Sequence, residues 1–175
     1  MKRKITLAVL IVGCYLLQTT VFRFFELGQV VPNLLLILTI SLGFMQGKKQ
    51  GIWVGFFSGL MMDCFHGSHL GFHALLYMYL GYFSGFFCKV YFDDDLKVPL
   101  ILIASGDMIY NFVMYILFFM LQGKTDLYSY LKTVFLPEVV YTVLVSIVLY
   151  RFIYILNQKL VKDETRGNTS LWLRN

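Results

Sequence analysis

Long apolar stretches alternate along the chain with short clusters of charged and turn-forming residues. Continuous apolar runs, without the strict alternation of a membrane β-strand, predict helices. Six runs lie between the interruptions, at residues 5–22, 31–45, 51–65, 70–91, 98–121 and 134–156. Since a helix needs about 20 residues to cross a bilayer core of roughly 30 Å, we predict an all-α polytopic membrane protein with about six transmembrane helices.

The third run is the weakest of the six. Residues 51–65 would extend only about 22 Å at helical rise, and they follow the polar segment 46–50. We expect this helix to be tilted, buried or re-entrant, which is tolerated where other protein covers it. A count of five spans is the competing interpretation.

The composition supports a membrane protein with a single domain. Of the 175 residues, 58% are hydrophobic and only 14% are charged, with a mean hydropathy of +0.70. Soluble domains are about 45–50% apolar and about 25% charged. Six spans would use about 120 residues, so we predict one transmembrane domain over residues 1–156 and a polar cytoplasmic tail over 157–175. This composition argues against a disordered chain, a disulfide scaffold or an ordinary nucleic-acid-binding domain.

The basic residues predict the orientation in the membrane. In a six-span arrangement, twelve of the 15 Lys and Arg fall on the side of the two termini, and three fall on the other side, namely Arg23, Lys124 and Lys132. Cytoplasmic loops carry an excess of Lys and Arg, so both termini are expected in the cytoplasm. The net charge of +5 then reflects topology and requires no acidic or nucleic-acid partner.

Glycines recur every four residues in the middle of the chain. The series comprises Gly43, Gly47, Gly51, Gly55 and Gly59, and the same spacing returns at Gly81 and Gly85. Residues four apart share one face of a helix, and a face without side chains lets another backbone approach closely. We predict a packing seam at Gly51, Gly55 and Gly59, in contact either with another helix of the same chain or with a second protein.

Few acidic residues interrupt the apolar runs, and each of them requires a partner or water. Asp63 ends the third run, Asp107 lies near the middle of the fifth, and Glu138 lies near the outer end of the sixth. We expect Asp63 and Glu138 at the membrane boundary, which leaves Asp107 as the one deep carboxylate. Because a single acid makes a poor proton or ion relay, capping or interhelical hydrogen bonding is the favoured role.

The histidines are clustered, at His66, His69 and His73. Two histidines four apart on a helix can share a metal, with Asp63 as a further ligand. However, Gly67 and Gly71 are expected to break the helix, so a polar outer loop is favoured over a metal-dependent membrane enzyme. No nucleophile elbow or phosphate-binding loop occurs elsewhere. We therefore predict no catalytic residue, no metal and no cofactor.

The middle of the chain resembles a known family. The features are Pro32-Asn33-Leu34-Leu35-Leu36 opening the second run, the glycine series ending in Gly59-Leu60-Met61-Met62-Asp63, then Leu70-Gly71, Tyr77 and Leu80-Gly81-Tyr82. In the order and spacing of these motifs the chain resembles MreD, a bacterial rod shape-determining family. Length, span count and charge placement agree over most of the chain, and the specific motifs lie within residues 32–85. The chain departs from the family at Asn33, where an acidic residue is expected in many members.

The resemblance implies a function and partners. Such a protein is a non-enzymatic scaffold of the bacterial inner membrane that binds MreC and, indirectly, works with MreB, RodA and a class B penicillin-binding protein in cell-wall synthesis and cell shape. The family is also similar in fold to the substrate-binding subunits of energy-coupling-factor transporters, an analogy that does not assign function alone. A small-molecule-binding subunit of such a transporter is the alternative, although the Ala-x-x-x-Ala face of those subunits is missing, since Val12 follows Ala8. Membrane lipids are expected partners, nucleic acid is not, and a homodimer is left open.

The residues expected to bind a partner or to pack helices lie between the second and fourth runs. They are Pro32, Asn33, Gly51, Gly55, Gly59, Asp63, Gly71, Gly81 and Gly85. Within this set, the three glycines of the third run form the close-approach face. Asp63 and the Pro32-Asn33 pair are expected to fix the ends of the two spans that present it, with Pro32 in the first turn of its helix.

Overall fold

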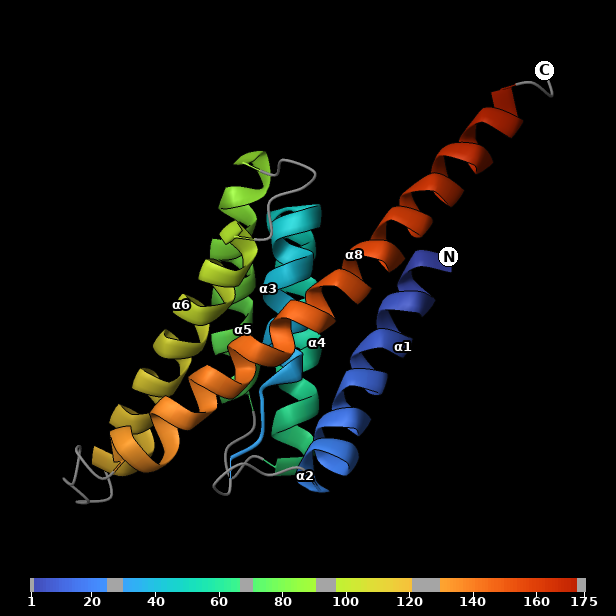
Figure 1. The fold of residues 1–175 in the computed structure, drawn as a ribbon. Helices are drawn as coiled ribbons and strands as arrows, with labels where there is room; N and C mark the ends of the chain where they lie inside the picture. Colours follow the sequence, from blue (N-terminus) through green and yellow to red (C-terminus); the bar gives the residue numbers. More distant parts are fainter. Residues whose placement is uncertain (1, 25–29, 67–70, 91–96, 121–129, 173–175) are drawn as a thin grey trace.

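Every secondary-structure element in the described part of the chain is a helix. The computed structural model describes residues 2–24, 30–66, 71–90, 97–120 and 130–172, and these contain no strand (Figure 1). The six helices are α1 (Lys2–Leu16) continued by η1 (Leu17–Val21) and α2 (Phe22–Phe24), α3 (Leu34–Gln46), α4 (Lys48–His66), α5 (Phe72–Ser84) with η2 (Gly85–Val90), α6 (Lys97–Met114) with η3 (Tyr115–Met120), and α8 (Leu136–Trp172) preceded by η4 (Leu131–Phe135). The prediction of an all-α protein with six helices is confirmed.

Three of the six helices are long and apolar enough to cross a membrane. They cover Ile5–Phe24, Lys97–Leu117 and Leu131–Lys159. Helix α3 is apolar but has only 13 residues, or about 20 Å at helical rise. For α3, α4 and α5 a full crossing therefore remains a prediction.

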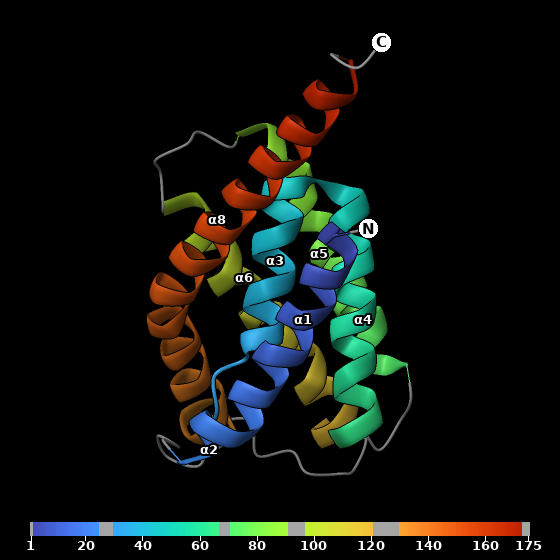
Figure 2. The same ribbon diagram turned by 90° about the vertical axis from the view of Figure 1, so that its right-hand side faces the viewer.

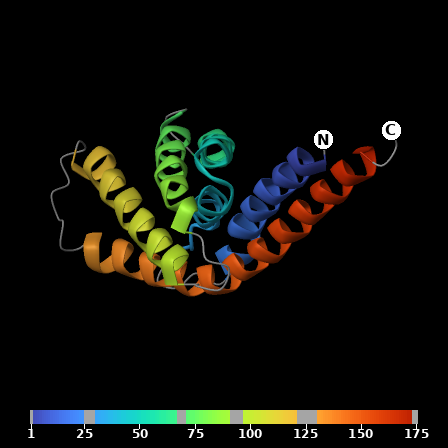
Figure 3. The same cartoon turned by 90° about the horizontal axis from the view of Figure 1, so that it is seen from above.

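Helix α3 forms the centre of the bundle. Its residues from Leu34 to Phe44 are all buried, as expected for a helix that is apolar on every side. It contacts α1, α4, α5, α6 and α8, which surround it in the view from above (Figure 3). The two hydroxyl groups within it, on Thr39 and Ser41, donate to the carbonyl oxygens one turn earlier, so their burial leaves no donor unpaired.

The ends of the helices alternate between the two ends of the bundle. Figure 2 shows the N-terminus, the turn between α3 and α4, and the C-terminal part of α8 at the same end. The end of α4 and the start of α5 lie at the opposite end. The count of Lys and Arg on the two sides assumed that successive helix connections lie at opposite ends of the bundle, and these helix ends do so.

Two helix boundaries differ from expectation. Helix α3 begins at Leu34, so Pro32 lies before the helix and its expected place in the first turn is wrong. The reason is the cap: the Asn33 side chain accepts a hydrogen bond from the Leu36 N–H at 3.2 Å, which places the helix start after Asn33. Helix α8 continues to Trp172, so the region predicted as a polar tail is helical over residues 157–172.

Candidate functional site

The glycine face of α4 lies against α5. A Cβ atom added at Gly55 would overlap the backbone between Tyr77 and Met78, and one added at Gly59 would overlap the backbone of Ala74. Both glycines and Gly51 are buried. The two backbones are therefore in direct contact, which only residues without a side chain permit.

Helix α3 joins this contact at its C-terminal end. A Cβ on Gly43 of α3 would lie 2.6 Å from the carbonyl oxygen of Gly81, and a Cβ on Gly51 would lie 3.0 Å from the Gly43 Cα. Gly85, at the start of η2, would likewise overlap the backbone of Lys48. The glycines of the series thus bring α3, α4 and α5 together at one end of the bundle.

The seam is therefore a contact between helices of one chain. Gly51, Gly55 and Gly59 lie in the α4–α5 contact, together with Gly81. A second protein would reach these positions only if α4 separated from α5. Gly71 has a different role: its φ of 94° lies in the left-handed region, and a Cβ there would meet nothing within 4 Å, so the turn before α5 is what requires glycine.

A matched pair of substitutions tests the seam. Gly59→Ala should destabilise the protein by about 1–3 kcal/mol, because the new methyl group forces α4 away from α5. Gly13→Ala in α1 should leave the stability unchanged or slightly higher, since nothing lies within 4 Å of its added Cβ and alanine favours helix. Thermal unfolding in detergent, followed by circular dichroism, measures both. Equal melting temperatures for the two variants would contradict a close contact at Gly59.

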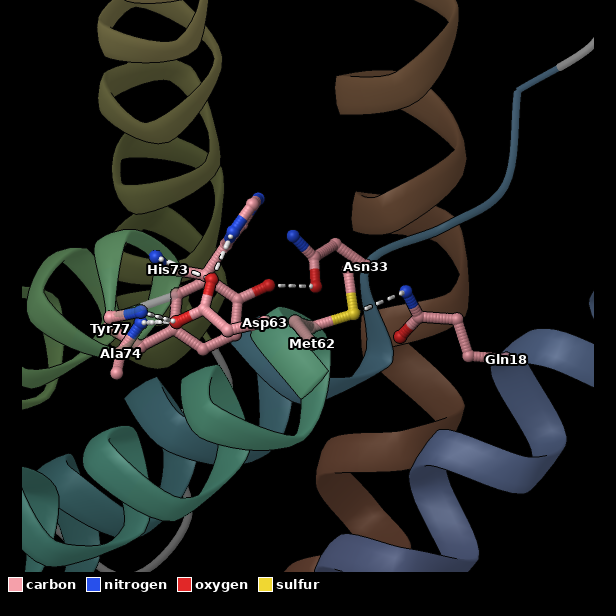
Figure 4. Close-up of polar contacts among 8 residues, drawn as sticks. Gln18, Asn33, Met62, Asp63, His73, Ala74 and Tyr77 are labelled. Atoms are coloured by element: carbon pink, nitrogen blue, oxygen red, sulfur yellow. Dashed lines mark hydrogen bonds and ion pairs between the residues drawn. The ribbon is translucent and has the colours of Figure 1, made fainter. Parts of the chain in front are cut away.

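Asp63, the last acid of α4, caps the start of α5 (Figure 4). One carboxylate oxygen accepts from the backbone N–H groups of Gly71 at 2.9 Å and Ala74 at 3.1 Å. The other accepts from the His73 N–H at 3.1 Å and lies 2.7 Å from the His73 ring Nδ1, a bond that requires Nδ1 to carry the proton. Asp63 is 1% exposed. A negative charge here satisfies donors that would otherwise be unpaired at a helix N-terminus.

The start of α3 is capped beside it. The Asn33 side-chain oxygen accepts from the Tyr77 hydroxyl of α5 at 2.7 Å as well as from Leu36 (Figure 4). The side-chain oxygen of Gln18, in η1, accepts from the Leu34 N–H at 3.0 Å. The start of α3 is thus joined directly to α5 by the bond between Asn33 and Tyr77, while Gln18 of η1 caps α3 and Asp63 of α4 caps α5. Because the Asn33 side chain acts only as an acceptor in these two bonds, the carboxylate of an acidic residue could accept the same two bonds.

Sequence reasoning did not find Gln18, and it gave Tyr77 only as one residue of the family motif, without a role as a hydrogen-bond donor. Gln18 is an isolated amide within the first apolar run, and Tyr77 is one of twelve tyrosines. An amide buried in an apolar helix requires a partner, and that signal could have selected Gln18. Nothing local distinguishes Tyr77, which has 0% exposure only because α3 and α5 meet there.

The Asp63 cap gives a second prediction. Asp63→Ala leaves three backbone N–H groups without their acceptor and should cost about 2 kcal/mol or more. His73→Phe keeps an aromatic ring and all three backbone bonds, so it should cost distinctly less. The double variant should lose less than the sum of the single variants, because both share one bond. Thermal unfolding of the three variants decides; a loss for His73→Phe as large as that for Asp63→Ala would contradict backbone capping as the main role of Asp63.

A second polar cluster lies where α6 meets α8. Asp107 of α6 is fully buried, and neither of its carboxylate oxygens has a hydrogen-bond partner of normal geometry among the described residues, although the Thr142 side chain of α8 interacts with it. Glu138 of α8 interacts electrostatically with Asp107 and with the Asn111 side chain. Asp107 is therefore not isolated, because the contact between α6 and α8 brings Glu138 near it. That Asp107 is the one carboxylate deep in the membrane stays a prediction.

The metal hypothesis finds no group of ligands within the described residues. No three histidine, cysteine or acidic side chains there are placed to hold an ion. Of the three histidines, only His73 has a described side chain, and it is bonded to Asp63. His66 and His69 lie outside the described side chains.

One comparison with known proteins gives a match. A family model for the rod shape-determining protein MreD matches residues 1–160. No curated protein and no solved structure matches the chain at the significance we required. The expected likeness in fold to the substrate-binding subunits of energy-coupling-factor transporters therefore has no support.

Proposed function

The chain belongs to the MreD family, and we propose that it is a non-enzymatic scaffold that binds MreC and helps to organise cell-wall synthesis. The family determines rod shape, is a membrane protein family, and is structural rather than known as enzymatic. The match over residues 1–160 carries the proposal, because it covers all of the helices except the end of α8. MreB, RodA and a class B penicillin-binding protein are the indirect partners.

The structure favours α1 and α8 as the surfaces that meet other membrane helices. The glycine seam is occupied within the chain, whereas only 17% of the apolar window of the first span and 22% of that of α8 are buried. Val9 of α1 and Val148 of α8 are 64% and 74% exposed. Helices with such large apolar faces need lipid or other helices around them, and we propose one of these faces as the MreC contact.

We further propose that the protein resides in the bacterial inner membrane with both termini in the cytoplasm. Two observations support this orientation: the twelve-to-three distribution of basic residues and the common end of the bundle at which the two termini lie (Figure 2). The excess of Lys and Arg belongs on the cytoplasmic side.

Cross-linking in cells tests the proposed scaffold. A photo-reactive amino acid is placed at Val9 or at Val148, whose side chains both point out of the bundle. MreC should be captured at one of these two positions. Leu75 of α5, which is 53% exposed, provides the matched position on a different face and should not capture it. The readout is the identity and amount of the captured protein for each position.

Three outcomes distinguish the possible roles. Capture of MreC at one of the two positions supports the scaffold, whereas capture of transporter components instead would establish the small-molecule-binding alternative. Capture of a second copy of the chain alone would replace the MreC contact by a homodimer. Each variant must first restore rod shape to cells without the native copy, so that a misfolded protein is not scored.

A further inference from the structure

A groove runs along the contact between α4 and α5. It has a volume of about 500 Å³, and only α4, α5 and the adjacent Gly71 line it. Its walls include Ile52, Phe56 and Leu60 from α4 and Leu75, Met78 and Tyr82 from α5. The groove therefore lies apart from the proposed MreC faces on α1 and α8, and at Gly71 and Ala74 it borders the turn that Asp63 caps.

The groove follows from the glycine seam. Ile52, Phe56 and Leu60 each come one residue after a seam glycine, so they lie beside the line of backbone contact. The two backbones touch along that line, and the larger side chains of α4 and α5 form the walls of a groove beside it. The groove walls are apolar apart from the hydroxyl groups of Tyr79 and Tyr82, so a hydrocarbon chain is the chemistry that they suit.

A positive charge lies at one end of this groove. Lys48, the first residue of α4, precedes Ile52 by one turn, and its ammonium lies 3.3 Å from the centre of the Phe86 ring and 5.6 Å from that of Tyr82. Tyr82 is itself part of the groove wall. The two rings hold the ammonium by cation–π attraction and leave its N–H groups available to an oxygen ligand.

The charge has no acidic partner in the described part of the chain. Neither Lys48 nor Lys49 forms an ion pair with a described carboxylate, and Lys49 is exposed. Lys49 follows Lys48 in the first turn of α4, which begins at the end of the bundle where the N-terminus lies (Figure 2). A ligand that complements the whole surface has an anionic head at Lys48 and Lys49 and an apolar tail along α4 and α5.

We propose that this surface binds an anionic phospholipid, with its phosphate at Lys48 and Lys49 and one acyl chain in the α4–α5 groove. The proposal goes beyond the scaffold function and does not depend on it. Basic residues next to membrane segments attract anionic lipids, and here the aromatic rings fix one of them beside an apolar groove. Neutral phospholipids match the groove but lack the net negative charge that Lys48 and Lys49 complement.

A photo-reactive lipid tests the proposal on the full chain. The protein is reconstituted into vesicles of phosphatidylcholine that contain a phosphatidylglycerol with a diazirine in its acyl chain, and the labelled peptides are identified by mass spectrometry. Labelling should concentrate on α4 and α5 peptides that contain Ile52 or Met78. Added unlabelled phosphatidylglycerol should reduce it, whereas added phosphatidylcholine should not.

Two pairs of variants separate the head site from the groove. Lys48→Gln should lower the groove labelling about fivefold, the effect of one basic residue near an anionic surface, while Lys132→Gln, with the same change of charge in η4, should leave it unchanged. Met78→Trp should fill the groove and abolish labelling there. Leu144→Trp places the same bulk on an exposed face of α8 and should have no effect.

The proposal is overturned by labelling that is spread equally over α8 and the groove, by equal competition from the two lipids, or by unchanged labelling in Lys48→Gln. Cross-links to a second copy of the chain at the groove would also overturn it, since the occupant would then be protein. Lys48→Gln leaves the apolar contacts of the groove intact, so the variant should unfold at the same temperature as the parent protein. The labelling of the two proteins is compared once their melting temperatures have been shown to be equal.

Discussion

The arrangement of the bundle depends on the contact between the backbones of α4 and α5. Glycines at three successive turns of α4 allow it, because a Cβ at Gly55 or Gly59 would overlap the backbone of α5. Helices in a membrane associate through packing rather than through the hydrophobic effect, so a close contact is what gives these two relatively short helices a fixed position. Helix α3 is then enclosed against them, and the apolar groove is the space left beside the line of contact.

Polar side chains fix the starts of α3 and α5, at the end of the bundle where α4 ends. Asp63 satisfies the start of α5, and Asn33 with Gln18 satisfies the start of α3. Buried helix ends must have such partners because unpaired backbone groups are costly away from water. The polar residues of this region therefore act as helix caps, whereas the exposed apolar faces proposed for a partner lie on α1 and α8. The inference that the protein is a scaffold agrees with this division between an inner core and outer faces.

Much of this arrangement could be predicted from local sequence, and the remainder could not. A spacing of four residues identifies a glycine face on any helix, so Gly51, Gly55 and Gly59 were recognisable. The helix that packs against this face was not predictable, because a helix of a second protein could pack there as well as one of the same chain. The proximity of Glu138 to Asp107 results from the crossing of α6 and α8, and the burial of Tyr77 results from the contact between α3 and α5; neither has a local pattern. Pro32 illustrates a further limit, since proline suits the first helical turn but the Asn33 cap placed the helix start later.

The contact between Gly59 and Ala74 is the most direct place to test whether the backbones of α4 and α5 touch. The chain has only three alanines, so a protein labelled with ¹³C at the Cα of glycine and alanine and placed in lipid bilayers gives few cross-peaks in solid-state NMR. The account predicts a strong cross-peak between the Cα atoms of Ala74 and Gly59, lost on Ala74→Ser. Absence of that cross-peak in a protein whose helices are intact would mean that α4 and α5 are apart, and would contradict the account.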